Sequence, residues 1–240
     1  MNQTYMKEKK IFPLVMSMAL PMMLSMAFNS LYNIVDSYFV AKLSEDAMTA
    51  LSLVYPAQNL LTAVAVGFGV GVNAMISFYL GAQNQEKADK TATQGMELGV
   101  LHGVLLMILF LCGINWFLGM FTKSDTVRAL GMEYSNVVFL FSTIVTGGIT
   151  LEKIFQAVGR MRATMVSMIA GFVTNIVLDP LLIFGIGPFP RMEIAGAALA
   201  TGIGQVITLL VYIIYYVLDP LPVKLRRTYL RPEGEICGKT

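Results

Sequence analysis

Six stretches of the chain are almost continuously apolar and are separated only by short polar segments. They cover about residues 11–40, 49–80, 95–121, 131–156, 163–187 and 195–218. Each is long enough to cross a bilayer as a helix, which takes roughly 20 apolar residues. None shows the alternation of a membrane β-strand, and only helices and closed barrels satisfy their backbone groups in lipid. The pattern predicts an all-α integral membrane protein whose six-helix transmembrane bundle covers residues 11–218, between a short segment, 1–10, and a polar tail, 219–240.

The composition agrees with a membrane protein. Apolar residues make up 56% of the 240 residues and charged residues only 13%, with a mean hydropathy of +0.67. This mixture leaves no room for a sizeable soluble domain. We expect no enzyme and no bound cofactor, because no nucleophile with a neighbouring base and no cluster of metal ligands is visible. The net charge of +2 is too small and too scattered to predict a nucleic-acid partner.

The first apolar stretch follows Lys7, Lys9 and Lys10, as the core of a signal peptide does. It continues beyond Tyr32, however, and no small-residue cleavage site follows it. We therefore interpret it as a retained first span, with a cleaved signal peptide as the alternative.

Lysine and arginine are unevenly divided between the two ends of the predicted bundle. An even number of spans places both termini on one side, and that side holds 13 of the 17 lysine and arginine residues. The other side holds Lys42, Lys123, Arg128 and Arg191. Because these residue types are retained on the cytoplasmic side, we predict a multi-pass protein of the plasma (inner) membrane with cytoplasmic N and C termini.

Small residues recur at fourfold spacing in the second and sixth stretches, as they do where membrane helices approach closely. The second stretch has Gly67 with Gly71, and Gly69 with Asn73 and Ser77; the sixth has Gly196, Ala200 and Gly204. We expect these stripes to be buried between helices.

Ionisable side chains at membrane depth are costly and are usually functional. Glu97, Glu133 and Glu152 fall within one or two turns of predicted span ends, where they can reach headgroups or water, and Asp219 begins an Asp-Pro turn. Structural roles are therefore favoured for these four acids. Asp36 and Asp179 lie deeper.

Both of these aspartates continue polar stripes. The stripe of the first span consists of Ser25, Asn29, Asn33 and Asp36, with Tyr32 beside it, and that of the fifth consists of Gly171, Asn175 and Asp179. Spacings of three and four residues put each set on one helix face. Polar stripes inside a bundle line cavities, so we expect Asn29, Tyr32 and Asn33 to line one.

The two aspartates are also predicted to share a depth. Both lie about 9 to 14 Å inside the outer edge at 1.5 Å of rise per residue, and Tyr134 and Thr201 fall at a similar level of their own spans. We therefore predict that Asp36, Tyr134, Asn175, Asp179 and Thr201 form one constellation in the outer half of the bundle.

This constellation predicts an ion site. Two carboxylates in a poorly solvated cavity cannot both stay ionised cheaply, so either one holds a proton or the pair holds a cation. The neutral oxygens of Asn175 and Thr201 suit a hard monovalent ion. The coupling ion is then H⁺, or Na⁺ bound by Asp36, Asn175, Asp179 and Thr201. The alternative is that the aspartates only join helices by hydrogen bonds.

Two prolines lie in the helices that carry these acids. Pro21 is in the middle of the first span, and Pro180 directly follows Asp179. Proline removes a backbone hydrogen bond and bends a helix, so both helices are predicted to be deformable. His102, on an otherwise apolar third span, is a possible pH-titrating group, although a single histidine without partners is more often a packing residue.

The sequence resembles the multidrug and toxic compound extrusion (MATE) transporters over about residues 10–230. The matching segments are Leu20-Pro21, Asn33-Ile34-Val35-Asp36, Gly81-Ala82, Gln156-Ala157-Val158-Gly159-Arg160, the run from Asn175 to Gly185 and the run from Ile194 to Thr201. The resemblance implies one lobe of a two-lobe, twelve-helix transporter that exports organic cations and other amphiphiles in exchange for protons or sodium.

The resemblance also implies residue roles. In the branch similar to DNA-damage-inducible protein F, the first lobe uses an aspartate of its first helix and an Asn-x-x-x-Asp motif of its fifth, which Asp36, Asn175 and Asp179 match. By the same likeness, Tyr134 and Thr201 complete the network, and protonation of Asp36 bends the first helix at Pro21.

Only six spans are predicted here, and residues 219–240 resemble a truncated linker to a missing second lobe. The partners we expect are an amphiphilic small molecule, the bilayer, and either the C-terminal lobe or a second copy of the chain. The leading hypothesis is an antiporter lobe with Asp36 and Asp179 as coupling acids. One alternative is a lipid-precursor flippase, which would favour a cationic cavity, whereas no Arg or Lys is predicted deep in a span. The other is a non-transporting fragment that only associates with other helices.

Overall fold

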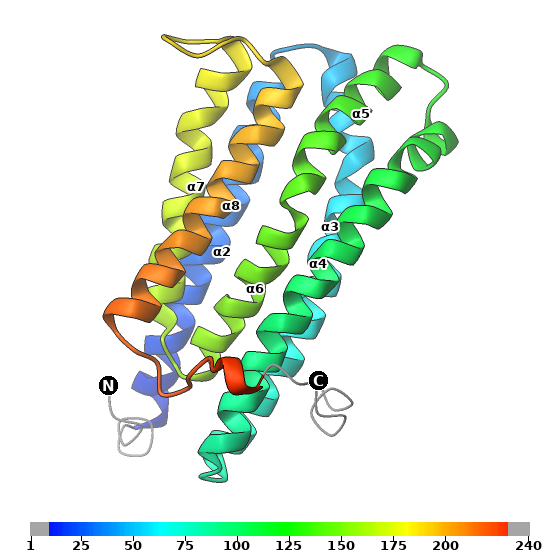
Figure 1. Ribbon diagram of the computed structural model, residues 1–240. Helices are drawn as coiled ribbons and strands as arrows, with labels where there is room; N and C mark the ends of the chain where they lie inside the picture. The colour runs from blue at the N-terminus through cyan, green and yellow to red at the C-terminus, as the bar shows by residue number, and fades with distance from the viewer. Residues whose placement is uncertain (1–9, 230–240) are drawn as a thin grey trace.

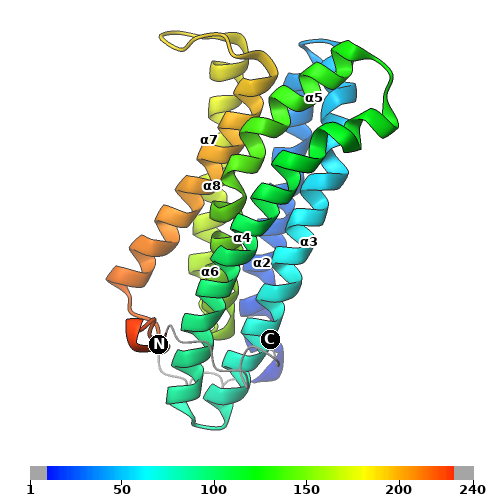
Figure 2. The same ribbon diagram turned by 45° about the vertical axis from the view of Figure 1, so that its right-hand side comes forward.

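The structure, a computed structural model, describes residues 10–229, and this part of the chain contains six helices that are long and apolar enough to cross a membrane. The helices are α2 (Ile11–Ala41), α3 (Glu45–Gly81), α4 (Gln85–Phe121), α5 (Asp125–Val138), α6 (Ser142–Ala157), α7 (Met161–Phe184) and α8 (Glu193–Leu218). The 3-10 turn η1 (Phe139–Phe141) joins α5 and α6 into the fourth span, and η2 (Arg227–Tyr229) follows α8. The helices stand side by side in one bundle (Figures 1 and 2), which confirms the predicted all-helical fold.

Several helices begin earlier than the apolar pattern predicts, because polar side chains cap their first turns. The hydroxyl of Ser44 accepts a hydrogen bond from the backbone N–H of Ala47 at 3.0 Å, and Asn84 accepts one from Lys87 at 3.1 Å. Ser124 caps α5 in the same way. Such caps satisfy N–H groups that have no partner inside the helix. Helices α3, α4 and α5 therefore extend beyond the apolar segment by a polar turn or more.

The connections of the bundle lie at two opposite ends (Figure 1). The turns after α2, α4 and α7 are at one end, and the start of α2, the turns after α3 and α6, and η2 are at the other. Lys42, Lys123, Arg128 and Arg191 belong to the first end, as the charge pattern predicts. The pattern also counted residues outside the described range, namely Lys7, Lys9, Arg231 and Lys239.

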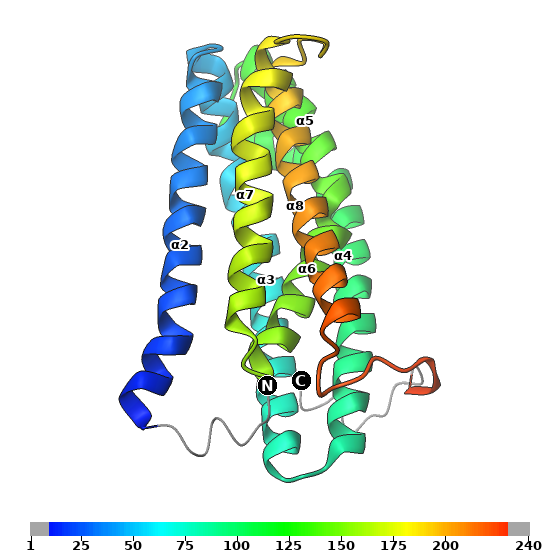
Figure 3. The ribbon, with the colours of Figure 1, turned by 90° about the vertical axis from the view of Figure 1, so that its left-hand side faces the viewer.

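Helix α2 stands at the edge of the bundle and packs mainly along α7 (Figure 3). It continues through Pro21, just as α7 continues through Pro180, so neither proline breaks its helix. Each proline nevertheless leaves one carbonyl without its helical N–H donor.

Glycines set the distance between α7 and α8. A Cβ atom added to Gly204 would lie 2.8 Å from the carbonyl oxygen of Gly171, and one on Gly196 would lie 2.7 Å from that of Leu182. Only glycine permits such contacts between backbones. The stripe of Gly196, Ala200 and Gly204 is buried, as predicted.

The glycines of α3 behave differently from one another. Gly69 is buried against α6, and the amide of Asn73 donates to the carbonyl oxygen of Lys153 at 3.0 Å. The prediction for Gly67 is wrong, because this residue is exposed and an added Cβ would meet nothing within 4 Å. The two glycines lie on different faces of α3, and only one of these faces is in contact with α6.

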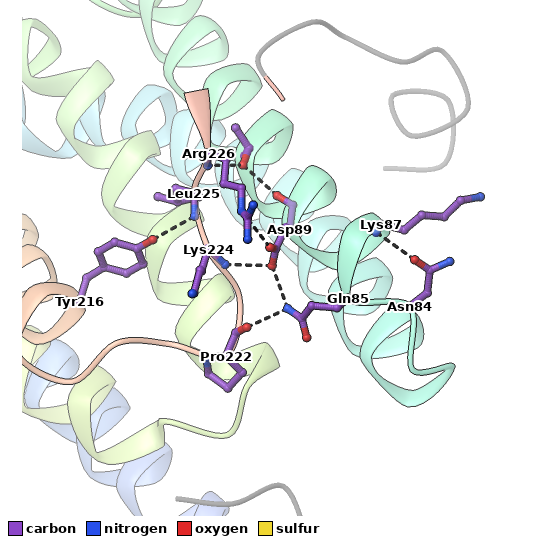
Figure 4. Close-up of polar contacts among 10 residues, drawn as sticks. Asn84, Gln85, Lys87, Asp89, Tyr216, Pro222, Lys224, Leu225 and Arg226 are labelled. Carbon is purple, nitrogen blue, oxygen red and sulfur yellow. Dashed lines mark hydrogen bonds and ion pairs between the residues drawn. The ribbon is translucent and has the colours of Figure 1, made fainter. Parts of the chain in front are cut away.

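The segment after α8 packs back onto the start of α4 (Figure 4). The buried carboxylate of Asp89 accepts hydrogen bonds from the side chain of Gln85 and from the backbone N–H of Lys224, at 2.8 and 3.0 Å, and pairs with Arg226. Leu221 and Val223 of this segment are also buried. Helix α8 ends at Leu218, where the transmembrane lobe is predicted to end, and residues 219–229 of the tail pack against the bundle. The rest of the tail lies outside the described residues.

Candidate functional site

A cavity of about 1060 Å³ is lined by residues of every span except α4. Asn29, Tyr32, Asn33 and Asp36 of α2 all line it, as the polar stripe predicts. The amide of Asn33 donates to the side-chain oxygen of Asn29 at 2.8 Å, one turn earlier. The stripe therefore presents a continuous polar wall to the cavity.

Asn175 connects the two buried sides of the constellation. Its side-chain amide donates to Oδ1 of Asp179 at 3.2 Å and to the hydroxyl of Thr201 at 3.3 Å. Thr201 reaches the cavity wall, whereas Asp179 is fully buried behind it. The glycine contacts between α7 and α8 bring these side chains within hydrogen-bonding range.

Asp36 faces this cluster from α2. Its side chain is buried and lies close enough to Asp179 and Tyr134 to interact electrostatically with both. Asp36 and Asp179 are each five residues before the end of their helix, which agrees with the predicted common depth. The structure thus brings together all five predicted residues.

One further residue of this cluster was not predicted. The amide of Gln58 on α3 donates to the hydroxyl of Tyr134 at 3.4 Å, and both residues line the cavity. The sequence signal that could have identified Gln58 is the presence of a glutamine within the apolar stretch 49–80.

Three buried oxygen atoms of this site have no hydrogen-bond partner among the described residues: Oδ1 of Asp36, Oδ1 of Asn175 and Oδ2 of Asp179. Buried polar atoms without partners cost free energy, and most are satisfied in native proteins. A shared proton or a hard cation would satisfy oxygens of this kind. Residues 10–229 contain no cluster of three or more His, Cys, Asp or Glu side chains suited to a metal ion, so a cation here would also need the neutral oxygens.

The cavity lining also contains an ion pair near the end of the fourth span. Lys153 contacts Glu152 on α6 at 3.0 Å, and the two side chains are only 13% and 15% exposed. Glu152 and Lys153 lie five and four residues before the end of α6, near the span end as the sequence predicts, but both side chains line the cavity. Sequence position alone did not show this, because it does not tell which side of the bundle a side chain near a span end faces.

The remaining ionisable residues have ordinary surroundings. Nδ1 of His102 lies 2.7 Å from the carbonyl oxygen of Leu98, and its ring lies 4.8 Å from that of Phe68, which fits a packing role. Glu97 and Glu133 are exposed, and Asp219 forms an ion pair with Arg160.

Comparisons with known proteins identify the family and the fold of the chain. The family model MatE matches residues 21–181. The multidrug export protein MepA of Staphylococcus aureus is 29% identical over 236 residues, which are 98% of this chain and 51% of MepA. The chain therefore spans about half the length of the curated relatives it matches.

Solved structures show the same relationship. A MOP superfamily transporter from Pyrococcus furiosus, whose binding-pocket polarity is described as suggesting a different function, is 28% identical with a TM-score of 0.86. A multidrug resistance MATE family transporter in an outward-facing conformation has the same identity and TM-score. In both cases the match covers 94% of this chain and 49% of the other. Family match, relatives and fold together show that the chain belongs to the MatE family and has the fold of the N-terminal lobe of a MATE transporter.

Proposed function

We propose that the chain acts as one lobe of a secondary antiporter that exports drug-like organic cations and amphiphiles in exchange for H⁺ or Na⁺. Asp36 and Asp179 are the coupling acids, and Tyr134, Asn175 and Thr201 complete the site. The observation that carries this proposal is the set of buried oxygens of Asp36, Asn175 and Asp179 that have no hydrogen-bond partner within residues 10–229. The printed function of MepA, multidrug export, supports the transport class.

The coupling follows from where the two acids sit. Asp36 is on the cavity wall of α2, the helix at the edge of the bundle, and Asp179 is behind the wall on α7. A proton or sodium ion held between them favours the arrangement in which α2 lies close to α7. An ion that binds one arrangement better than another shifts the balance between them, and Pro21 gives α2 a place to bend.

The cavity wall suits amphiphiles of varied shape. Tyr32 and Phe172 stack with their ring centroids 5.3 Å apart, and Met26, Met48 and Met168 line the same space. Methionine side chains adapt to different ligands, and aromatic rings offer flat apolar surface.

A second lobe, or a second copy of this chain, covers the open side of the cavity in this proposal. Asn29, Asn59 and Thr62 line the cavity and are exposed. Polar side chains facing hydrocarbon are unfavourable, so a partner that presents polar groups is needed there. The lysine-rich and arginine-rich end of the bundle, with the start of α2 and η2, then faces the cytoplasm.

The cavity favours this function over transport of lipid-linked pyrophosphates. Its lining includes one ammonium group, that of Lys153, and this group is already paired with Glu152. Asp36 adds a second carboxylate. A site for a pyrophosphate needs excess positive charge, and this lining does not supply it.

The substitution Asp36→Asn in a transport-competent protein, with the second lobe present, tests the proposal. We expect it to abolish drug resistance while protein levels in the membrane stay unchanged. Glu133→Gln is the matched control, because Glu133 is exposed and lies outside the cavity lining. Survival of resistance in the Asp36 variant would show that the coupling role is wrong.

A further inference from the structure

The Glu152–Lys153 pair lies at the opposite end of the cavity from Asp36. Glu152 follows Tyr134 by 18 residues along the fourth span, which corresponds to about 27 Å of helix. The same cavity is lined by both residues. The ion pair is therefore a second polar centre, separate from the proposed coupling site.

Three side chains of α6 form this centre. The ammonium group of Lys153 donates to Oε1 of Glu152 at 3.0 Å and to Oε1 of Gln156 at 3.1 Å. The amide of Gln156 donates to the same Glu152 oxygen at 2.6 Å. The ammonium group of Lys153 and the amide of Gln156 thus donate to the same oxygen of Glu152, Oε1.

The ion pair between the adjacent residues Glu152 and Lys153 depends on the packing of the Lys153 side chain against α3. Adjacent residues on a helix point in different directions, so the Lys153 side chain must turn back to meet Glu152. Its stem passes over Gly69, where an added Cβ would lie 2.8 Å from Cγ of Lys153. The stem is held between α3 and α6 while its charged end reaches the cavity.

Polar capacity remains unused at this centre. Within residues 10–229, Oε2 of Glu152 has no hydrogen-bond donor. Tyr212 of α8, whose side chain is buried, also lines the cavity. An added Cβ at Gly148, one turn from Glu152, would meet nothing within 4 Å. A carboxylate oxygen without a hydrogen-bond donor therefore lies in the cavity lining, one turn from the open space at Gly148.

The sign of the charge on the ligand follows from Glu152, because Oε2 of its carboxylate receives no hydrogen bond from Lys153 or Gln156. The cavity lining also includes the apolar side chains of Ile149 and Met168. A ligand with one positive charge and an apolar body matches both features.

We propose that Glu152 binds the cationic group of an amphiphile at this end of the cavity, and that Lys153 is the resident counter-ion that occupies the carboxylate when no ligand is bound. This inference rests on the proposed function only for the class of ligand. A buried carboxylate without a counter-ion is costly, so Lys153 keeps the empty cavity stable. An entering organic cation replaces one positive charge by another at Glu152, and a neutral compound cannot make this exchange.

Binding of two probes of the same shape and opposite charge tests the proposal. The purified chain in lipid nanodiscs is titrated with tetraphenylphosphonium and, separately, with tetraphenylborate. We expect Glu152→Gln to weaken tetraphenylphosphonium binding about tenfold and Lys153→Met to strengthen it about tenfold, as for a close charge pair. Glu152→Gln leaves tetraphenylborate binding unchanged or stronger, because Lys153 is then free of its carboxylate.

Glu193→Gln is the matched control, because Glu193 pairs with Arg191 at the exposed loop between α7 and α8 and is 55% exposed. It removes the same charge and leaves both probes unaffected. Unchanged tetraphenylphosphonium binding in Glu152→Gln overturns the inference, and so does weaker binding in a folded Lys153→Met. If Lys153→Met does not fold, the binding result for Glu152→Gln is sufficient to test the inference. This variant is expected to fold because glutamine keeps a side-chain oxygen that can accept a hydrogen bond from Lys153. The resistance test with Asp36→Asn reads a different property, so either proposal can fail without the other.

Discussion

The side-chain amide of Asn175 on α7 lies 3.3 Å from the hydroxyl of Thr201 on α8, and the same amide contacts Asp179 one turn away. This link joins the two helices at the level of the proposed coupling site. It depends on glycine, because Gly204 lies beside Asn175 and its missing Cβ leaves room for the backbone of α7. Helix packing and the polar site are therefore one structural feature.

Gly171→Ala is expected to separate α7 from α8. The added Cβ would lie 2.6 Å from the carbonyl oxygen of Gly204, a contact that neither backbone can relieve without moving. Overpacking of this kind costs about 1–3 kcal/mol, and thermal unfolding followed by circular dichroism measures the loss. Gly67→Ala is the control with unchanged or higher stability, because its Cβ would meet nothing within 4 Å. Equal melting temperatures for the two variants would contradict the packing argument.

Asp89→Asn is expected to loosen the segment 219–229 from α4. The carboxylate is 3% exposed and holds Gln85, Lys224 and Arg226 together. Asparagine keeps one acceptor oxygen but loses the charge and presents a donor, at a cost of about 1–3 kcal/mol. Trypsin should then cleave faster after Lys224 and Arg226, as mass spectrometry of timed digests would show.

Glu86→Gln is the control for the contacts that Asp89 makes with the segment 219–229. Glu86 is on the same turn region of α4 and pairs with Lys90, but its side chain is 67% exposed. Exposed pairs contribute little to stability, so digestion should proceed at the wild-type rate. Faster cleavage in both variants would mean that the charge of α4, rather than the contacts of Asp89, holds the segment.

Pro21→Ala is expected to reduce export and to leave the ion site intact. Alanine restores a backbone hydrogen bond and is about 3 kcal/mol more favourable than proline inside a helix, so α2 resists bending. Transport of a fluorescent cation by cells carrying the complete transporter measures the effect. Pro56→Ala is the control, because Pro56 is also inside a membrane-spanning helix but on α3, which carries neither coupling acid. Normal export by the Pro21 variant would exclude a bending role for this residue.

The sequence by itself determined the six spans, the polar stripes and the common depth of the two aspartates. Helical rise and periodicity are nearly the same in every span, and all spans cross the same thickness of membrane. Residue spacing therefore fixes both the level of Asp36 and Asp179 and the helix face on which each lies. The family resemblance adds a role for these residues that spacing alone does not provide.

The tertiary structure alone decided which faces meet. Gly67 and Gly69 each belong to a stripe with fourfold spacing, yet only Gly69 packs against α6. Glu152 and Lys153 are neighbours in sequence whose pairing required a flexible side chain to pass over another helix, and Asp89 meets a segment more than 130 residues away. The physical reason is that a helix determines the direction of each side chain within itself, whereas its neighbours are selected by the packing of the whole bundle.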